Sequence, residues 1–118
     1  MDDTWRLSIR QELEAGIVVL AVAGRIGSAA SGQLMDALIR AANDGHRRIL
    51  VDFAGVDYVS SAGLLAIDAA AGRLYGDGGA LVLCAVCEPV RVVLDMAGIL
   101  GDVPVEPTRE AGLARLRA

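Results

Sequence analysis

The sequence predicts an α/β fold, a mixed β-sheet that opens with a hairpin, continues in βα units and is covered by about four helices. Apolar runs of strand length alternate with segments whose apolar residues recur at helical spacing, the pattern of a layered α/β domain. The chain has 118 residues, the size of one domain, so residues 1–118 are expected to fold as a single domain. In the simplest arrangement, the helices cover one face of the sheet only.

The first two predicted strands form the hairpin. Residues 5–10 alternate apolar and polar side chains, which is typical of a strand with one buried face. After a turn at Ala15-Gly16, residues 17–23 are continuously apolar, as in a strand buried on both faces.

The periodicity then changes to that of a helix over residues 28–42, with apolar side chains along one stripe. Either Ser28 or Ser31 is expected to cap its start, and residues 43–45 (Asn-Asp-Gly) to end it. Residues 49–53 are the next predicted strand.

A second helix is predicted to begin at Ser60 or Ser61 and to end at the glycine-rich residues 76–79. The following residues, 80–86, form another apolar run and are predicted to be a strand buried on both faces.

The last part of the chain is predicted to be helix, strand and helix. Pro89 suits the first position of a helix, where its missing N–H costs nothing, and Gly98 suits the position just after its end. Residues 103–105 are a short strand, and Pro104 places it at a sheet edge. A final helix is predicted over residues 108–117.

Composition excludes several classes of function. All 11 basic residues are arginine, so lysine-dependent P-loop and Schiff-base chemistry is absent. The net charge of −4 and the scattered arginines disfavour binding to nucleic acid. No apolar run approaches the ~20 residues that span a bilayer, so no membrane insertion is expected. The acidic start of the chain does not resemble a signal peptide, and a cytoplasmic location is expected.

Two other candidate sites have simpler structural explanations. Cys84 and Cys87 form a C-x-x-C pattern that could act as a redox dithiol, but Cys84 lies within an apolar strand and is expected to face the core. His46 is the only histidine and lies in a charged connection, where a solvated surface role is expected. No metal site, cofactor or catalytic residue is predicted.

The junction at Ser60 and Ser61 has two interpretations. One serine is a natural N-cap for the predicted helix. A serine hydroxyl at a helix N-terminus also lies where a phosphate group would be stabilised by free N–H groups and the helix dipole. These two roles are compatible, and they can fall on neighbouring serines.

Residues 51–64, VDFAGVDYVSSAGL, resemble the central motif of STAS domains, the sulphate-transporter and anti-sigma-factor-antagonist domains. The resemblance extends over nearly the whole chain, in segments that keep the family's order: residues 22–26, 79–84, 89–91 and 94–100.

The resemblance implies a non-enzymatic regulator similar to an anti-sigma factor antagonist. In that family, an anti-sigma factor that is also a serine kinase phosphorylates a serine at the start of the second helix and so breaks its own complex with the antagonist. By register with Gly63, this phosphoacceptor is Ser61, with Ser60 as the alternative. The implied partner-binding residues are Ser60, Ser61, Ala62, Gly24, Gly27, Ser28, Asp57 and Tyr58. The family's cysteine falls on Cys84 and implies a packing role.

The sequence departs from the family at two positions. The aspartate that usually precedes the acceptor serine is Ser60 here, and a second aspartate, near the start of the first helix, is Gly27. These departures keep two alternatives open: a constitutive antagonist, and a STAS subunit that docks on a membrane transporter or lipid-transport ATPase complex without phosphorylation. A thiol enzyme using Cys84 and Cys87 is a third. A weak homodimer through a small apolar surface patch is also expected.

Overall fold

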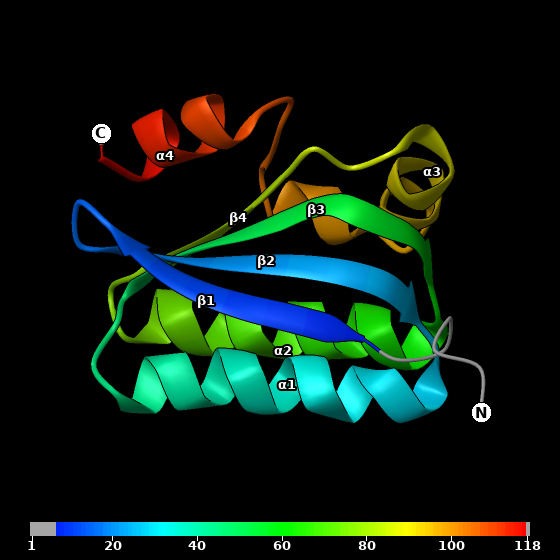
Figure 1. Ribbon diagram of the computed structural model, residues 1–118, viewed down its shortest axis with the longest axis horizontal. Helices are drawn as coiled ribbons and strands as arrows, with labels where there is room; N and C mark the ends of the chain where they lie inside the picture. Colours follow the sequence, from blue (N-terminus) through cyan, green and yellow to red (C-terminus); the bar gives the residue numbers. More distant parts are fainter. Residues whose placement is uncertain (1–6, 118) are drawn as a thin grey trace.

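A five-stranded mixed sheet lies at the centre of the structure, a computed structural model that describes residues 7–117 (Figure 1). Trp5 and Arg6 of the first predicted strand lie outside the described residues. The strands follow the chain in the order β1-β2-β3-β4-β5. Their bounds are Ser8–Glu14 (β1), Ile17–Ile26 (β2), Arg48–Val59 (β3), Ala80–Cys84 (β4) and Val105–Glu106 (β5). The helices are Ser28–Asn43 (α1), Ser61–Gly76 (α2), Glu88–Met96 (α3) and Arg109–Arg117 (α4).

The predicted opening hairpin is confirmed. β1 and β2 are antiparallel and are joined by a two-residue turn at Ala15 and Gly16, both with positive φ (52° and 79°). Positive φ at both positions is the signature of a type I′ turn, whose twist matches that of the strands. The remaining neighbours in the sheet are parallel.

β3 is longer than the predicted residues 49–53. It continues to Val59 because two register shifts keep it paired with the end of β2. Gly55 lies at the first shift, and a Cβ built there would be 2.7 Å from the Cβ of Ala23. This close approach of the two backbones lets β3 continue alongside β2 to the end of the sheet where α2 begins.

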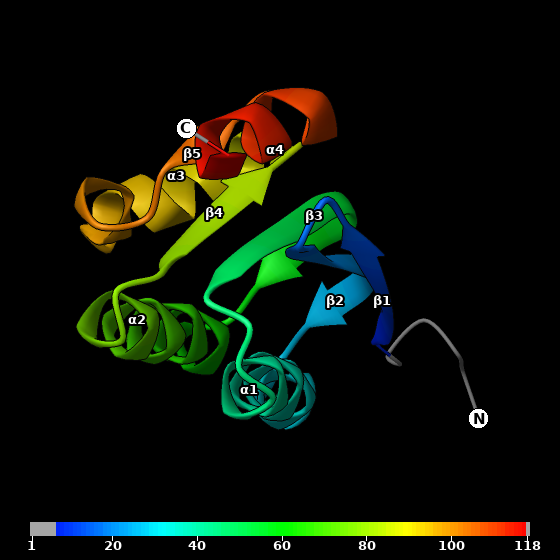
Figure 2. The same cartoon turned by 90° about the vertical axis from the view of Figure 1, so that its left-hand side faces the viewer.

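The sheet buries both faces, which corrects the expectation that helices cover one face only. Figure 2 shows α1 and α2 on one side of the sheet and α4 on the other. Alternate residues of the central strands divide accordingly. Leu20, Val51 and Leu83 join the larger core with α1, α2 and α3, whereas Val19, Leu50 and Cys84 pack with α4.

Gly112 explains how closely α4 lies on the sheet. A Cβ at this position would be 2.5 Å from Cδ1 of Leu50, so only a glycine lets the helix come this near.

Several predicted boundaries move by a few residues. Neither Ser28 nor Ser31 caps α1: Gly27 occupies the N-cap position without a side-chain bond, and the Ser31 hydroxyl instead donates to the carbonyl of Ser28 at 2.6 Å. β4 ends at Cys84 rather than residue 86, because Ala85 adopts a positive φ of 57°.

Near the end of the chain, α3 begins at Glu88, one residue before Pro89, and the last strand is Val105–Glu106 rather than residues 103–105. The edge position predicted for this strand is confirmed by the strand order. α4 begins at Arg109, and Thr108 precedes it with its hydroxyl accepting from the N–H of Ala111. None of the helices in the described part of the chain is both long and apolar enough to cross a membrane.

Candidate functional site

The starts of α1 and α2 lie together at one end of the molecule, where β2 and β3 end. Because these strands are parallel and adjacent, their last residues, Ile26 and Val59, are paired. The chain is fixed there by a hydrogen bond of 2.7 Å, in which the N–H of Ser60 donates to the carbonyl of Ile26. The predicted serine junction is therefore bonded directly to the end of β2.

Ser60 is the N-cap of α2. Its hydroxyl accepts a hydrogen bond of 3.2 Å from the N–H of Gly63, and its carbonyl accepts one of 3.0 Å from the N–H of Leu64. The side chain is partly buried. Ser60 is thus committed to starting the helix.

Ser61 is the first residue of α2 and is exposed. Within the described residues its hydroxyl has no hydrogen-bond partner. The structure therefore separates the two interpretations of the serine pair: one hydroxyl caps the helix, and its neighbour faces outward.

Gly63 allows α2 to start so close to the sheet. A Cβ at this position would lie 2.8 Å from Cγ2 of Ile26 and 2.9 Å from Cγ1 of Val59. Both of those side chains are buried. The glycine therefore determines how Ser60 and Ser61 are presented.

The strand ends beside the serines carry a cation and an aromatic ring. Cζ of Arg25 lies 4.9 Å from the ring centroid of Tyr58, and the two residues are paired across β2 and β3. Such a contact at an exposed site contributes about 0.5–1 kcal/mol. Asp57 is exposed at the second register shift of β3 and makes no ion pair with any described residue.

The predicted binding residues Gly24, Gly27 and Ser28 do not lie together in one loop. Gly24 lies within β2, with a positive φ of 121°, and so is not part of a loop before α1. Gly27 is the N-cap residue of α1, and Ser28 is its exposed first residue. The link between β2 and α1 is therefore a single residue.

A shallow apolar groove runs between α1 and α2 from the position next to Ser61. Its volume is about 430 Å³, and it is lined from α1 by Ser31, Gly32 and Met35, and from α2 by Ala62, Leu65, Ala66, Asp68 and Ala69. Leu65 is 69% exposed, a large value for leucine. We call this surface the α1–α2 groove.

Sequence reasoning missed Leu65 and Met35. The available signal was the pair Leu64-Leu65, of which only Leu64 fits the apolar stripe that packs on the sheet. Arg25 was also missed, and no local pattern identifies it, because its contact with Tyr58 depends on the strand pairing.

The cysteines do not form a dithiol site. Cys84 is fully buried as expected, and burial, helped by the charge of Asp52, raises the pKa of its thiol to about 12. Cys87 is partly buried against the opposite core, and its thiol donates to the carbonyl of Val56 at 3.5 Å. Both are free cysteines, and no group of three metal-ligating side chains occurs among the described residues.

Comparison with known proteins gives a consistent result. The STAS domain family matches residues 8–112 of this chain. A candidate anti-sigma factor antagonist of Bordetella bronchiseptica, BtrV, is 35% identical over 102 residues, which cover 86% of this chain and 88% of the relative.

Two solved structures share the fold. An anti-sigma factor antagonist from Mycobacterium paratuberculosis superposes with a TM-score of 0.89 at 22% identity, over 96% of each chain. SpoIIAA of Bacillus in its phosphorylated form gives a TM-score of 0.73 at 20% identity, over 93% of this chain and 100% of that chain. At these identities the likeness concerns the fold alone.

Proposed function

This chain belongs to the STAS domain family, and from that premise we propose that it is an anti-sigma factor antagonist controlled by phosphorylation of Ser61. The proposed partner is an anti-sigma factor that is also a serine kinase. We place this interaction in the cytoplasm. The chain itself is the substrate and binder in this scheme and has no catalytic activity. The similarity to BtrV supports the antagonist role.

The observation that carries the proposal is the division of roles between the two serines. Ser60 is occupied by the helix cap, whereas the Ser61 hydroxyl is exposed at the first position of α2. A kinase therefore has access to Ser61 without unwinding the helix. Phosphorylation of Ser60 would instead remove the hydroxyl that accepts from Gly63.

A phosphate on Ser61 is compatible with the fold. At the N-terminus of a helix, a negative charge is stabilised by about 0.3–1 kcal/mol when exposed. The N–H groups of Gly63 and Leu64 already bind Ser60, but those of Ser61 and Ala62 come earlier in the first turn, where helices have unpaired donors. The modification should therefore change what α2 presents and leave the fold intact.

The proposed docking surface is the α1–α2 groove together with Ser61. It is largely apolar, and Leu65 is an exposed side chain that a partner would bury. A phosphate adds about −1.5 to −2 charges beside this surface. Burying that charge against an apolar partner costs desolvation, so phosphorylation should release the partner.

The absence of the two family aspartates has a structural explanation at one position. Serine and aspartate are both good N-cap residues, so Ser60 performs the capping that an aspartate would perform. Gly27 provides no side-chain cap for α1. The surface beside Ser61 therefore lacks two negative charges, which also suits a partner that binds without phosphorylation, such as a transporter complex.

Phosphosite mapping tests the switch. Wild type, Ser60→Ala and Ser61→Ala are incubated with ATP and a candidate anti-sigma factor kinase from the genome that encodes this chain. We expect phosphate on wild type and Ser60→Ala, at Ser61, and none on Ser61→Ala. Phosphate retained by Ser61→Ala would move the acceptor to another residue. A partner that binds tightly but never transfers phosphate would favour a constitutive antagonist or a transporter subunit.

A further inference from the structure

β1 is an edge strand with an open hydrogen-bonding side. It lies at the end of the strand order and pairs only with β2 among the described strands (Figure 2). The two-residue turn fixes which residues face outward. The pair that flanks such a turn, Glu14 and Ile17, is hydrogen-bonded, and hydrogen-bonded pairs alternate along an antiparallel ladder. Arg10, Glu12 and Glu14 therefore bond to β2.

The backbone groups of Ile9, Gln11 and Leu13 accordingly point to the open edge. One contact supports this assignment. Leu7 precedes Ile9 by two residues, so its carbonyl should also point to the open edge, and it accepts a hydrogen bond of 2.8 Å from Nε2 of Gln33 on α1. The helix thus satisfies the edge at Leu7 and leaves the next three outward-facing residues uncovered by any described segment.

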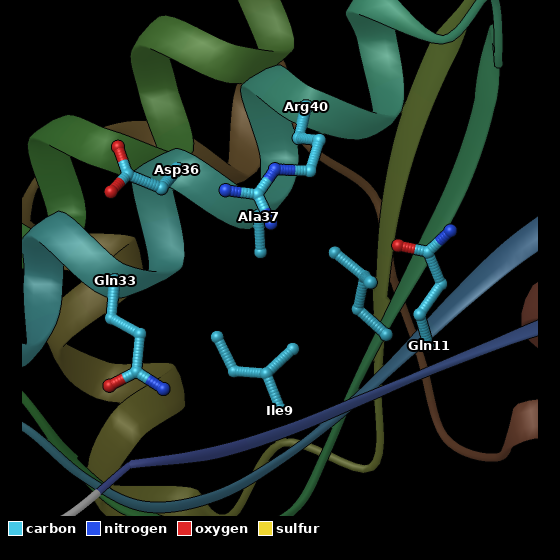
Figure 3. A pocket seen from close by; sticks show the side chains of 7 residues that line it. Ile9, Gln11, Gln33, Asp36, Ala37 and Arg40 are labelled. Carbon is cyan, nitrogen blue, oxygen red and sulfur yellow. The ribbon is translucent and has the colours of Figure 1, made fainter.

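The side chains of these residues border a groove. Ile9 and Gln11 lie across from Gln33, Ala37 and Arg40 of α1, around a space of about 310 Å³ (Figure 3). Ile9 is partly buried against the core, whereas Leu13, four residues along the same strand, is 65% exposed. An exposed leucine on an open strand edge invites pairing with another strand.

The sequence of β1 is complementary to itself in one register. In a symmetric antiparallel pair centred on Gln11, each Ile9 faces Leu13 of the second copy, and each Arg10 faces Glu12 of the second copy. Opposite charges and apolar pairs directly across strands are favourable. Arg10 has this freedom, because its side chain is 73% exposed and its ion pair with Glu12 of its own chain is long, at 3.4 Å.

The neighbouring registers are worse. A pair centred on Arg10 places two arginines opposite each other, and a pair centred on Glu12 places two glutamates opposite each other. Like charges in direct opposition destabilise a strand pair. In the remaining registers, an odd-numbered residue of one copy pairs with an even-numbered residue of the other. The backbone groups of the first point to the open edge and those of the second point to β2, so they cannot bond.

From this self-complementarity we propose that β1 pairs with β1 of a second copy of this chain, antiparallel and centred on Gln11, to form a continuous ten-stranded sheet. Leu13 of each copy then lies beside Ile9 of the other, at the mouth of the groove in Figure 3. The inference does not rest on the proposed function. In Figure 2 the β1 edge and α2 are on opposite sides of the molecule, so Ser61 stays accessible in the dimer.

The dimer should be weak. A single pair of seven-residue strands with two leucine contacts is small beside a stable interface, which buries roughly 1,200–2,000 Å². We therefore expect a dissociation constant on the order of 10 μM to 1 mM, to be sought at high protein concentration.

Sedimentation velocity of the full chain over a wide concentration range is the first test. We expect wild type to shift from monomer to dimer and Leu13→Asp to stay monomeric, with at least tenfold weaker association. Leu65→Asp is the matched control, since Leu65 is exposed to nearly the same extent (69% against 65%) but lies on α2. It should dimerise like wild type. A wild type that stays monomeric throughout, or a dimer lost in Leu65→Asp but kept in Leu13→Asp, would overturn the proposal.

A cysteine scan tests the register. In the proposed pairing, residue 11 faces itself at a Cα separation of about 5.5 Å, within the range of a disulfide, whereas the two copies of residue 10 are more than ~7 Å apart. Under a mild oxidant, Gln11→Cys should form a covalent dimer and Arg10→Cys should not. The wild-type chain, oxidised in parallel, measures any covalent dimer that forms through its own Cys87. Crosslinking of Arg10→Cys in preference to Gln11→Cys would contradict the register.

Discussion

At the scale of single residues, the serine pair shows how a helix start and a modification site coexist in two adjacent positions. Ser60 meets the backbone requirement of α2, so Ser61 has no structural duty among the described contacts. The sequence predicted the junction and its two uses. It could not assign them, because the N-cap is decided by where β3 releases the chain, and β3 ends six residues later than its apolar run suggests.

The two serines should differ in their effect on stability. Ser60→Ala removes the acceptor of the Gly63 N–H and should lower the free energy of unfolding by about 1 kcal/mol. Ser60→Asp should restore most of that loss, and Ser61→Ala should change stability by less than about 0.5 kcal/mol. Urea denaturation of the three variants measures these differences. An equal loss in both alanine variants would show that Ser61 also supports the helix.

Gly63 is a second residue whose role follows from contact distances. Gly63→Ala places a methyl group within 3 Å of both Ile26 and Val59, so α2 must shift or the core must adjust. We expect a loss of about 1–3 kcal/mol, typical of overpacking. Gly72→Ala in the same helix is the control, because no atom lies within 4 Å of a Cβ there. It should be neutral or stabilising in the same denaturation assay.

The thiols should react at different rates. Cys84 is buried and its pKa is about 12, so almost no thiolate exists at pH 8. Alkylation of the native protein followed by mass spectrometry should label Cys87 well before Cys84, and Cys84 should react once the protein is unfolded in urea. Rapid labelling of Cys84 in the native state would reopen the thiol-enzyme hypothesis.

At the scale of elements, α4 was predicted to within one residue, but the face of the sheet that it covers was not predicted. Its position on the opposite face of the sheet depends on contacts far apart in the chain, namely Gly112 against Leu50 and Arg109 against Asp52 and Glu12. A nine-residue helix with three buried residues gives no periodic signal of which face it covers. By contrast, α1, α2 and β2 were predicted well because their apolar patterns are long.

Arg109 fastens α4 to two strands. Its guanidinium donates at 2.7 Å to Glu12 of β1 and at 3.1 Å to Asp52 of β3. The hydrogen bond from Arg109 is the main cause that lowers the pKa of Glu12 below its ordinary value of 4.5. The contribution of the Arg109–Glu12 interaction to the free energy of unfolding is therefore complete above pH 4.5. It is lost as the pH falls through the lower pKa of Glu12 in the folded state.

Arg109→Gln tests this link through its pH dependence. The variant should be less stable than wild type at pH 7. The difference should shrink as the pH falls below 4.5, where Glu12 of the unfolded chain becomes protonated, and on through the lower pKa of Glu12 in the folded wild type. Chemical denaturation at pH 7 and pH 3 measures both values. Arg117→Gln, an exposed position of the same helix, serves as the control. A difference that is constant with pH would mean that Arg109 acts through packing alone.

At the scale of the whole molecule, the two candidate surfaces lie apart. The α1–α2 groove lies between the two helices next to Ser61, and the open edge of β1 lies beyond α1, on the side away from α2. A dimer through β1 would display two copies of the proposed docking surface, so a multivalent partner would bind it more tightly than a monomer. Leu65→Asp and Leu13→Asp should therefore affect partner binding and self-association separately.

Family membership follows from the ordered motifs and is confirmed by the match over residues 8–112. The residue-level function is less accessible to sequence, because it depends on how the elements assemble. Leu65 and Met35 line one groove only once α1 and α2 are packed together, and Arg25 contacts Tyr58 only once β2 and β3 are paired. The apolar periodicity of a segment predicts which of its residues are buried. A docking surface instead contains exposed apolar residues such as Leu65, which lie outside the buried stripe.

The most direct test of the central claim is a calorimetric titration of the candidate anti-sigma factor kinase with wild type, Ser61→Ala and Ser61→Asp. Ser61→Ala should bind within about threefold of wild type, because it adds no charge. Ser61→Asp should bind more than about a hundredfold more weakly, the effect of roughly 3 kcal/mol, while its unfolding midpoint stays within a few degrees of wild type. Equal affinity of all three proteins would contradict the claim that charge at Ser61 controls docking.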